Sequence, residues 1–304
     1  MQFEGIYAPV ITPFNEDSSI NEKAYATVIE HLIAQGTHGI VIGGTTGESY
    51  AMTREERVDQ FHYANKVIAG RVPWIAGVND IRTEDVCDYS VAAKEAGAAA
   101  ILLAVPPYSI PNDKELALHV LKVDRAANMP IMLYNYPGRS GTDFGEEFLE
   151  RVSKSSNIIA IKESSGDLNR IHLLAREYPH LQLSCGADDQ ALEFFAWGAR
   201  SWVCAAANFF AVEANALYKT CVIDGDFTKG RRIMKAMLPL MTVLERGGKF
   251  VQCVKYACEL DGLPSGRVRL PLRPMNKELK RKMREALQTA RITVRQIANE
   301  KQGE

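Results

Sequence analysis

The sequence lacks an excess of either charge and any long apolar segment. Its 304 residues contain 36 Lys and Arg against 37 Asp and Glu, a formal net charge of −1. Without a basic surplus, nucleic acid is not an expected partner. No apolar run approaches the roughly 20 residues that cross a bilayer, and no basic segment followed by an apolar one opens the chain. We therefore expect a cytoplasmic protein without a membrane span.

The six cysteines form no pattern typical of a metal site or a disulfide framework. No CxxC pair occurs, and no histidine cluster has zinc-finger spacing. Several cysteines lie inside apolar runs, as in SWVCAAA. We expect free, buried thiols that pack as small apolar side chains. The six are Cys87, Cys185, Cys204, Cys221, Cys253 and Cys258.

Short apolar runs alternate with longer amphipathic stretches. The runs are continuous rather than alternating, which is typical of parallel strands covered on both faces. Helices are predicted between them, with N-terminal caps at Asn21, Thr53 and Thr83 and further helix starts near Asn112, Phe144, Asp167 and Asp188. The eight predicted strands are 6–12, 39–44, 72–78, 99–105, 130–136, 157–163, 181–186 and 201–207.

Eight strand–helix units over about 205 residues predict a (β/α)₈ TIM barrel. A doubly wound sheet is the main alternative, but it usually has fewer strands and a glycine-rich phosphate loop after the first. Here TPFNEDSSI follows the first strand. Beyond the barrel, predicted at 1–208, residues 209–304 contain helical patterns and no strong strand signal, so a C-terminal helical region is expected.

In a TIM barrel the chemistry lies at the C-terminal ends of the strands. Lys162 closes the run 157–163, so its side chain is expected to enter the barrel mouth. An apolar pocket disfavours the charged form of lysine, lowers its pKa and leaves a nucleophilic amine. Such an amine can form a Schiff base with a carbonyl substrate. A lysine at this place can equally reach solvent or pair with a carboxylate.

Other polar groups end other strands. Tyr134 could shuttle protons beside a Schiff-base lysine. The hydroxyls of Thr45 and Thr46, in a glycine-rich turn, could bind a carboxylate. Arg139 could bind a second carboxylate through two hydrogen bonds, and Tyr108 follows two prolines. Each alone has an ordinary structural explanation, but together they occupy the face that the fold requires.

With these motifs the sequence resembles the dihydrodipicolinate synthase/N-acetylneuraminate lyase family of Schiff-base aldolases and lyases, over essentially its whole length. Two further motifs, at 186–189 and 268–272, add to the resemblance. The matching segments are GTTGE from Gly44, YNYPGR from Tyr134, IKE from Ile161, GADD from Gly186 and VRLPL from Val268.

The resemblance implies a role for each site residue. Lys162 would form the imine, and Tyr134 would move protons with help from Thr45 and from Tyr108 of a neighbouring subunit. Thr45 and Thr46 would bind the substrate carboxylate together with the backbone at Val203. Arg139 would bind the distal part of the second substrate. It also implies a homotetramer built as a dimer of dimers, and no metal or organic cofactor.

The reaction is expected from resemblance alone. The segments 124–141 and 247–263 look most like the hydroxyproline-catabolic branch, which opens Δ1-pyrroline-4-hydroxy-2-carboxylate with loss of ammonia and water to give 2-oxoglutarate semialdehyde. The alternative is 4-hydroxy-tetrahydrodipicolinate synthase, which condenses pyruvate with aspartate semialdehyde, or another 2-oxo-acid aldolase or dehydratase. The sequence has Ile81 and Pro107 where synthases regulated by lysine often have Asn and Tyr.

Two other classes fit less well. A non-catalytic binding protein would show a gap in the set of lysine, tyrosine and threonines, and none is present. A metal-dependent aldolase would need His or carboxylate ligands at strand ends. Four of the six histidines instead lie at strand starts or within predicted helices: His38, His62, His119 and His172.

Overall fold

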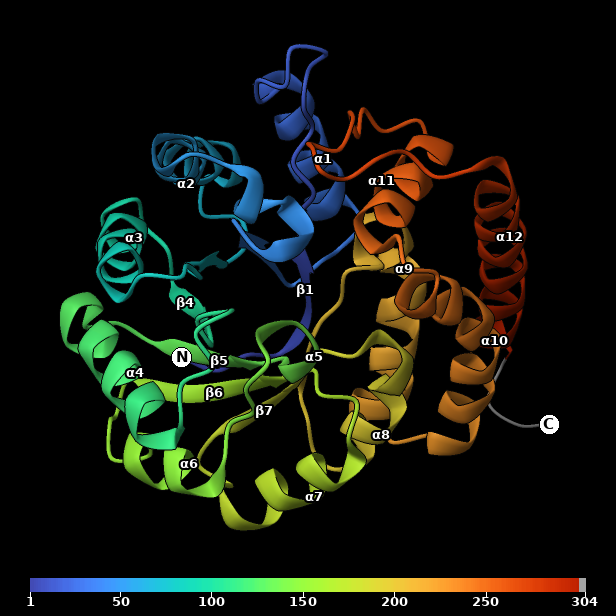
Figure 1. The fold of residues 1–304 in the computed structure, drawn as a ribbon. Helices are drawn as coiled ribbons and strands as arrows, with labels where there is room; N and C mark the ends of the chain where they lie inside the picture. Colours follow the sequence, from blue (N-terminus) through green and yellow to red (C-terminus); the bar gives the residue numbers. More distant parts are fainter. Residues whose placement is uncertain (301–304) are drawn as a thin grey trace.

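The computed structural model describes residues 1–300, and it is a closed barrel of eight parallel strands (Figure 1). Each strand pairs with the next along the chain, and β8 pairs with β1 to close the ring. The predicted (β/α)₈ TIM barrel is confirmed. The strands are β1 (Gly5–Pro9), β2 (Gly39–Ile42), β3 (Trp74–Gly77), β4 (Ala100–Ala104), β5 (Ile131–Asn135), β6 (Ile158–Glu163), β7 (Gln182–Cys185) and β8 (Ser201–Val203).

Helices surround the barrel, and a short one, α5, lies over the centre of the ring (Figure 1). The chain reaches each new strand through at least one helix, as parallel pairing requires. The helices of this part are α1 (Glu22–Ala34), α2 (Arg54–Ile68), α3 (Thr83–Glu95), α4 (Asp113–Ala127), α5 (Pro137–Ser140), α6 (Glu146–Val152), α7 (Leu168–Glu177), α8 (Ala191–Ala196) and α9 (Ala207–Tyr218).

Most predicted helix starts are confirmed by side-chain caps. Asn21 caps α1, Thr53 makes a full capping box on α2, and Asn112 and Asp167 cap α4 and α7. The start expected near Phe144 falls two residues early, because α6 begins at Glu146. At the start expected near Asp188, residues 188–190 form a 3₁₀ turn, η3 (Asp188–Gln190), before α8 begins.

The prediction that Thr83 caps a helix was wrong. Arg82 occupies the cap position of α3 and makes no capping hydrogen bond through its side chain, and Thr83 is the first helical residue. The Thr83 hydroxyl instead lies 2.9 Å from Nδ1 of His119 on α4. A tertiary hydrogen bond to the neighbouring helix has replaced the local one.

Two apolar layers result from the alternation of side chains along each strand. The larger layer packs between the strands and the surrounding helices. The smaller fills the barrel interior and includes Tyr7, Met132, Tyr134, Ala160 and Val203. Tyr134 and Val203 therefore stand at the inner face of the barrel, as their predicted roles require.

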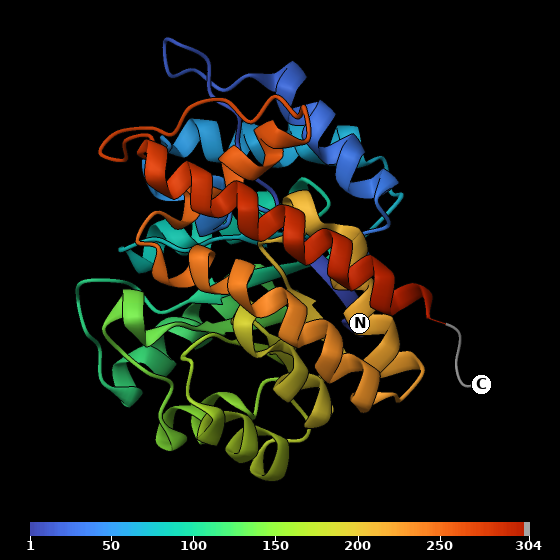
Figure 2. The same cartoon turned by 90° about the vertical axis from the view of Figure 1, so that its right-hand side faces the viewer.

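Three long helices follow the barrel and pack outside it. They are α10 (Phe227–Arg246), α11 (Phe250–Leu260) and α12 (Lys277–Asn299), and α12 runs beside α10 (Figure 2). The predicted boundary at 208 falls inside α9, which packs against β1 and α1 and so completes the ring of barrel helices. The C-terminal helical region proper therefore begins after α9.

The cysteines agree with the expectation of free thiols that pack as small apolar side chains. All six cysteines are free; five are buried, and Cys87 is half-buried. Among residues 1–300, no helix combines the length and apolar character needed to span a bilayer.

Candidate active site

A small pocket opens at the C-terminal ends of the strands, with a cavity volume of about 50 Å³. Strand ends supply most of its wall, and α10 and α11 supply Glu245 and Phe250. Every predicted catalytic or substrate-binding residue except Tyr108 lines it. These residues are Lys162, Tyr134, Thr45, Thr46, Arg139 and Val203.

Lys162 and Tyr134 face each other across two paired strands. Their Cα atoms are partners in the β5–β6 register, and the Lys162 Nζ lies 4.0 Å from the centre of the Tyr134 ring. Both are buried, at 7% and 6% exposure. Among residues 1–300, Lys162 has no ion-pair partner, so the alternative of a lysine paired with a carboxylate does not apply. An amine held this way is free to attack a carbonyl carbon.

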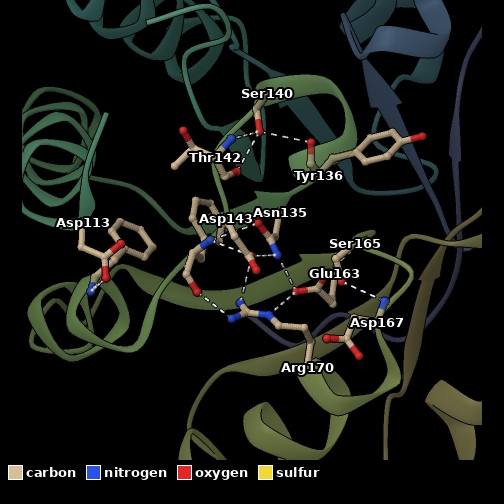
Figure 3. A network of polar contacts seen from close by, with 12 residues as sticks. Asp113, Asn135, Tyr136, Ser140, Thr142, Asp143, Glu163, Ser165, Asp167 and Arg170 are labelled. Carbon is tan, nitrogen blue, oxygen red and sulfur yellow. Dashed lines mark hydrogen bonds and ion pairs between the residues drawn. The ribbon is translucent and has the colours of Figure 1, made fainter. Parts of the chain in front are cut away.

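The carboxylate next in the chain is held on the opposite face of β6. Successive residues of a strand point to opposite sides, and Figure 3 shows Glu163 within a separate polar network. Its Oε2 accepts from Asn135 Nδ2 at 2.8 Å, and its Oε1 accepts from the Ser165 amide at 2.6 Å. Arg170 adds an ion pair at 3.4 Å. This network fixes the end of β6, and Glu163 does not form an ion pair with Lys162.

Gly186 makes room for the lysine. A Cβ built there would lie 2.0 Å from Oγ of Ser164 and 2.8 Å from Cγ of Lys162. The Ser164 hydroxyl is buried without a hydrogen-bond partner in residues 1–300, so a polar acceptor or donor is free beside the lysine stem. Any side chain at this position would displace both residues.

The threonine turn is held from the C-terminal helical region. Thr45 and Thr46 lie in a 3₁₀ turn, η1 (Thr45–Gly47), followed by Glu48 with a φ of 60°. Oε1 of Glu48 pairs with Lys255 Nζ of α11 at 2.6 Å, and both side chains are buried, at 0% and 3% exposure. Oε2 of Glu48 accepts from the Arg269 amide at 2.9 Å. The left-handed residue that ends the turn is thus fixed by two contacts more than 200 residues away in sequence.

Arg139 stands at the pocket mouth on α5. Its guanidinium lies 5.2 Å from the Tyr136 ring and 5.7 Å from the Phe250 ring. Within residues 1–300 it makes no ion pair, so a surface salt bridge does not account for its position. Burial raises the pKa of Tyr136, which keeps that phenol neutral beside the arginine. Arg139 is therefore available to an anionic substrate group.

Asp188 links the pocket floor to the end of β8. Its two oxygens accept from Trp202 Nε1 at 2.8 Å and from the Ala206 amide at 3.1 Å. Burial raises its pKa, although these hydrogen bonds and the charge of Lys162 oppose the rise. Asp188, which belongs to the GADD motif, thus fixes the chain on either side of Val203.

Glu245 is a pocket residue that sequence reasoning did not find. It lies in the last turn of α10 and lines the pocket with Arg139 and Phe250. The barrel rule directs attention to strand ends, and this carboxylate comes from a helix outside the barrel. The only local signal was its place just before Gly247 and Gly248, where the chain turns back towards the pocket.

Tyr108 does not line the pocket of its own chain. It is 92% exposed and has a φ of 74°. Its predicted role depended on a neighbouring subunit, and that role stays a prediction.

Residues 2–290 match the dihydrodipicolinate synthetase family. The chain is 34% identical over 288 residues to 4-hydroxy-tetrahydrodipicolinate synthase 1 of Halalkalibacterium halodurans, covering 94% of this chain and 97% of that protein. The 4-hydroxy-tetrahydrodipicolinate synthase of Methylacidiphilum fumariolicum superposes with a TM-score of 0.92 at 28% identity, over 97% and 98% of the two chains.

A third similar protein was solved with a small ligand. It is the chloride-inhibited dihydrodipicolinate synthase of Acinetobacter baumannii, complexed with pyruvate. Its TM-score is 0.88 at 29% identity, over 96% of this chain and 100% of that one.

Proposed function

This chain belongs to the dihydrodipicolinate synthetase family and is a lyase of the class I, Schiff-base-forming type; from that premise we propose that it condenses pyruvate with aspartate semialdehyde through an imine on Lys162. One observation carries the lysine's role: its buried amine has no ion-pair partner in the described chain and faces Tyr134 across paired strands. The acceptor is supported by the names of the relatives. This ranks the condensation above the deamination that the sequence segments favoured.

In the proposed reaction, the amine of Lys162 attacks C2 of pyruvate and water leaves. Loss of a proton from C3 then gives an enamine, with the imine as the electron sink, so the chemistry uses no metal or organic cofactor. Tyr134 lies next to the amine and moves the protons of these steps. The hydroxyls of Thr45 and Thr46, together with the backbone at Val203, hold the pyruvate carboxylate, and Arg139 holds the carboxylate of the acceptor.

A second candidate is the ring-opening deamination of Δ1-pyrroline-4-hydroxy-2-carboxylate. A specific observation favours it: both segments that carry this resemblance supply pocket residues. Segment 124–141 contributes Tyr136 and Arg139, and segment 247–263 contributes Phe250. Both segments therefore contribute to the part of the pocket where a second substrate or a ring substituent would bind.

A paired assay decides between the two reactions. Purified enzyme is given pyruvate with aspartate semialdehyde in one arm, and the hydroxypyrroline carboxylate in the other, with ammonia release measured in the second. Condensation well above any ammonia release is the expected result. Turnover in the ammonia arm alone would replace the first proposal with the second.

Substituting the tyrosine should slow the proton steps but leave the nucleophile in place. We expect Tyr134→Phe to reduce kcat about 10²- to 10⁴-fold, the usual range for a lost general acid–base. Borohydride trapping of pyruvate should still label Lys162, although more slowly. Tyr136→Phe, a neighbouring phenol whose ring centre lies 6.1 Å from that of Tyr134, is the matched control. Equal losses in the two variants would contradict a special role for Tyr134.

An oligomer, expected as a tetramer, is part of the same proposal. Exposed apolar side chains lie in the loops after successive strands, at Tyr50, Ile81, Tyr108 and Ile110. We expect Ile110→Glu to shift the assembly to smaller species in sedimentation analysis, because a charge in an apolar contact is costly. If Tyr108 serves a neighbouring site, that variant also loses activity. A fully active monomer would contradict this role.

A further inference from the structure

Glu245 is a carboxyl group inside the pocket that the steps above do not use. It lines the cavity beside Arg139, Asp188 and Phe250. It is half-buried, and among residues 1–300 its side chain makes no hydrogen bond and no ion pair. Arg139 affects it only through space, from beyond ion-pair distance. The Glu245 carboxyl and the Arg139 guanidinium thus both line the cavity without forming an ion pair with each other.

The surroundings favour the neutral acid. Glu245 lies in the last turn of α10, where the free carbonyl groups give the helix end a partial negative charge that disfavours a carboxylate. Because α10 packs against η3, Asp188 and Asp189 lie nearby. Burial, followed by these two carboxylates, raises the pKa of Glu245 to about 8, against the opposing charges of Arg139 and Lys162. At neutral pH the group is mostly protonated and can donate.

We infer that Glu245 is the general acid for the acceptor: it protonates the aldehyde oxygen while the enamine on Lys162 forms the new carbon–carbon bond. This inference rests on the proposed function. The enamine carbon attacks the aldehyde carbon, the carbonyl π pair moves to oxygen, and that oxygen takes the proton of Glu245. The enamine becomes an iminium, which water hydrolyses to release the product and the free amine. Solvent returns the proton to Glu245 through the pocket mouth.

The placement suits this division of roles. Lys162 and Tyr134 stand on adjacent strands at the inner face of the barrel, whereas Glu245 enters from a helix outside it. Arg139, beside Glu245 at the pocket mouth, holds the acceptor carboxylate in the proposed function. An acceptor whose carboxylate is held by Arg139 would lie in the cavity that both Lys162 and Glu245 line, so the enamine and the acid can reach it together.

The test compares Glu245→Gln with the wild type in two assays. Trapping of pyruvate by borohydride should proceed at the wild-type rate, because it does not involve the acceptor. Condensation with aspartate semialdehyde should fall about 10²- to 10⁴-fold. Arg246→Gln, an exposed neighbour on the same helix, is the matched control and should leave both assays unchanged.

The pH profile separates an acid from a structural role. A required acid loses activity as pH rises through its pKa, so wild-type kcat should fall above a pH of about 8. The charged and titratable groups around Glu245 are Asp188 and Asp189 of η3, Arg139 of α5, Tyr136 and Lys162. Asp189→Asn removes a negative neighbour, which lowers the pKa of Glu245 and should move this fall to lower pH. Glu245→Gln should lack the fall.

Three outcomes would overturn the inference. They are condensation by Glu245→Gln within about threefold of the wild type, a fall at high pH that persists in that variant, or loss of its pyruvate trapping. A wild type that traps no pyruvate contradicts the proposed function instead. A wild type that traps pyruvate but condenses nothing contradicts the acceptor, and with it this role of Glu245.

Discussion

Lys162→Ala should form no covalent adduct when incubated with pyruvate and borohydride, whereas the wild type should gain one adduct per subunit by intact mass. The variant should also lose at least about four orders of magnitude in kcat, because removal of a nucleophile removes the covalent route altogether. Lys162→Arg should behave in the same way, since a guanidinium keeps the charge but does not form the imine.

The control is a lysine in the segment between α6 and β6 that does not line the pocket. Lys154 is exposed and precedes β6. Lys154→Ala should trap pyruvate at the wild-type rate, and peptide mapping should place the label on Lys162. An adduct on Lys162→Ala, or a wild type that shows none, would contradict the Schiff-base assignment itself.

Lys255→Met should destabilise the protein by about 3–5 kcal/mol, because it leaves Glu48 as a buried charge without its partner. The Arg267 carbonyl also loses the hydrogen bond that Lys255 Nζ donates to it at 2.6 Å in the wild type. For a chain of this size the melting temperature should fall by about 2–4 °C for each kcal/mol. The KM for pyruvate should rise as well, since Glu48 ends the turn that carries Thr45 and Thr46.

A double variant separates the buried charge from the lost packing. Glu48→Gln with Lys255→Met removes both charges, and the glutamine oxygen can still accept from the Arg269 amide. We expect it to recover at least half of the stability lost in Lys255→Met. If Lys255→Met melts within about 2 °C of the wild type, the ion pair between Glu48 and Lys255 does not stabilise the fold.

The barrel could be predicted from sequence because its signals are local. Continuous apolar runs indicate strands buried on both faces, and the helices α1, α2, α4 and α7 begin at residues whose side chains cap them. Thr83 was the exception, because a distant histidine competes for its hydroxyl. Local sequence propensity does not reveal a hydrogen-bond partner that comes close only when the chain is folded.

The same limit applies to the site. Residues at strand ends could be placed in the pocket from the barrel rule, and six of the seven do line it. Glu245, which lines the pocket, and Lys255, which holds the threonine turn through Glu48, could not be placed from sequence, because both belong to helices outside the barrel. Their positions depend on how the C-terminal helices pack against the barrel, which helix periodicity does not reveal.

The register between β5 and β6 has a further consequence, for how relatives of this protein can diverge. Tyr134 and Lys162 are aligned by backbone hydrogen bonds within the sheet, which side-chain replacement elsewhere barely alters. Arg139, Glu245 and Phe250 come instead from a short helix and from the C-terminal helices. In the proposed reaction, substitution in those helices would change the groups around the acceptor while Tyr134 and Lys162 keep their alignment in the sheet.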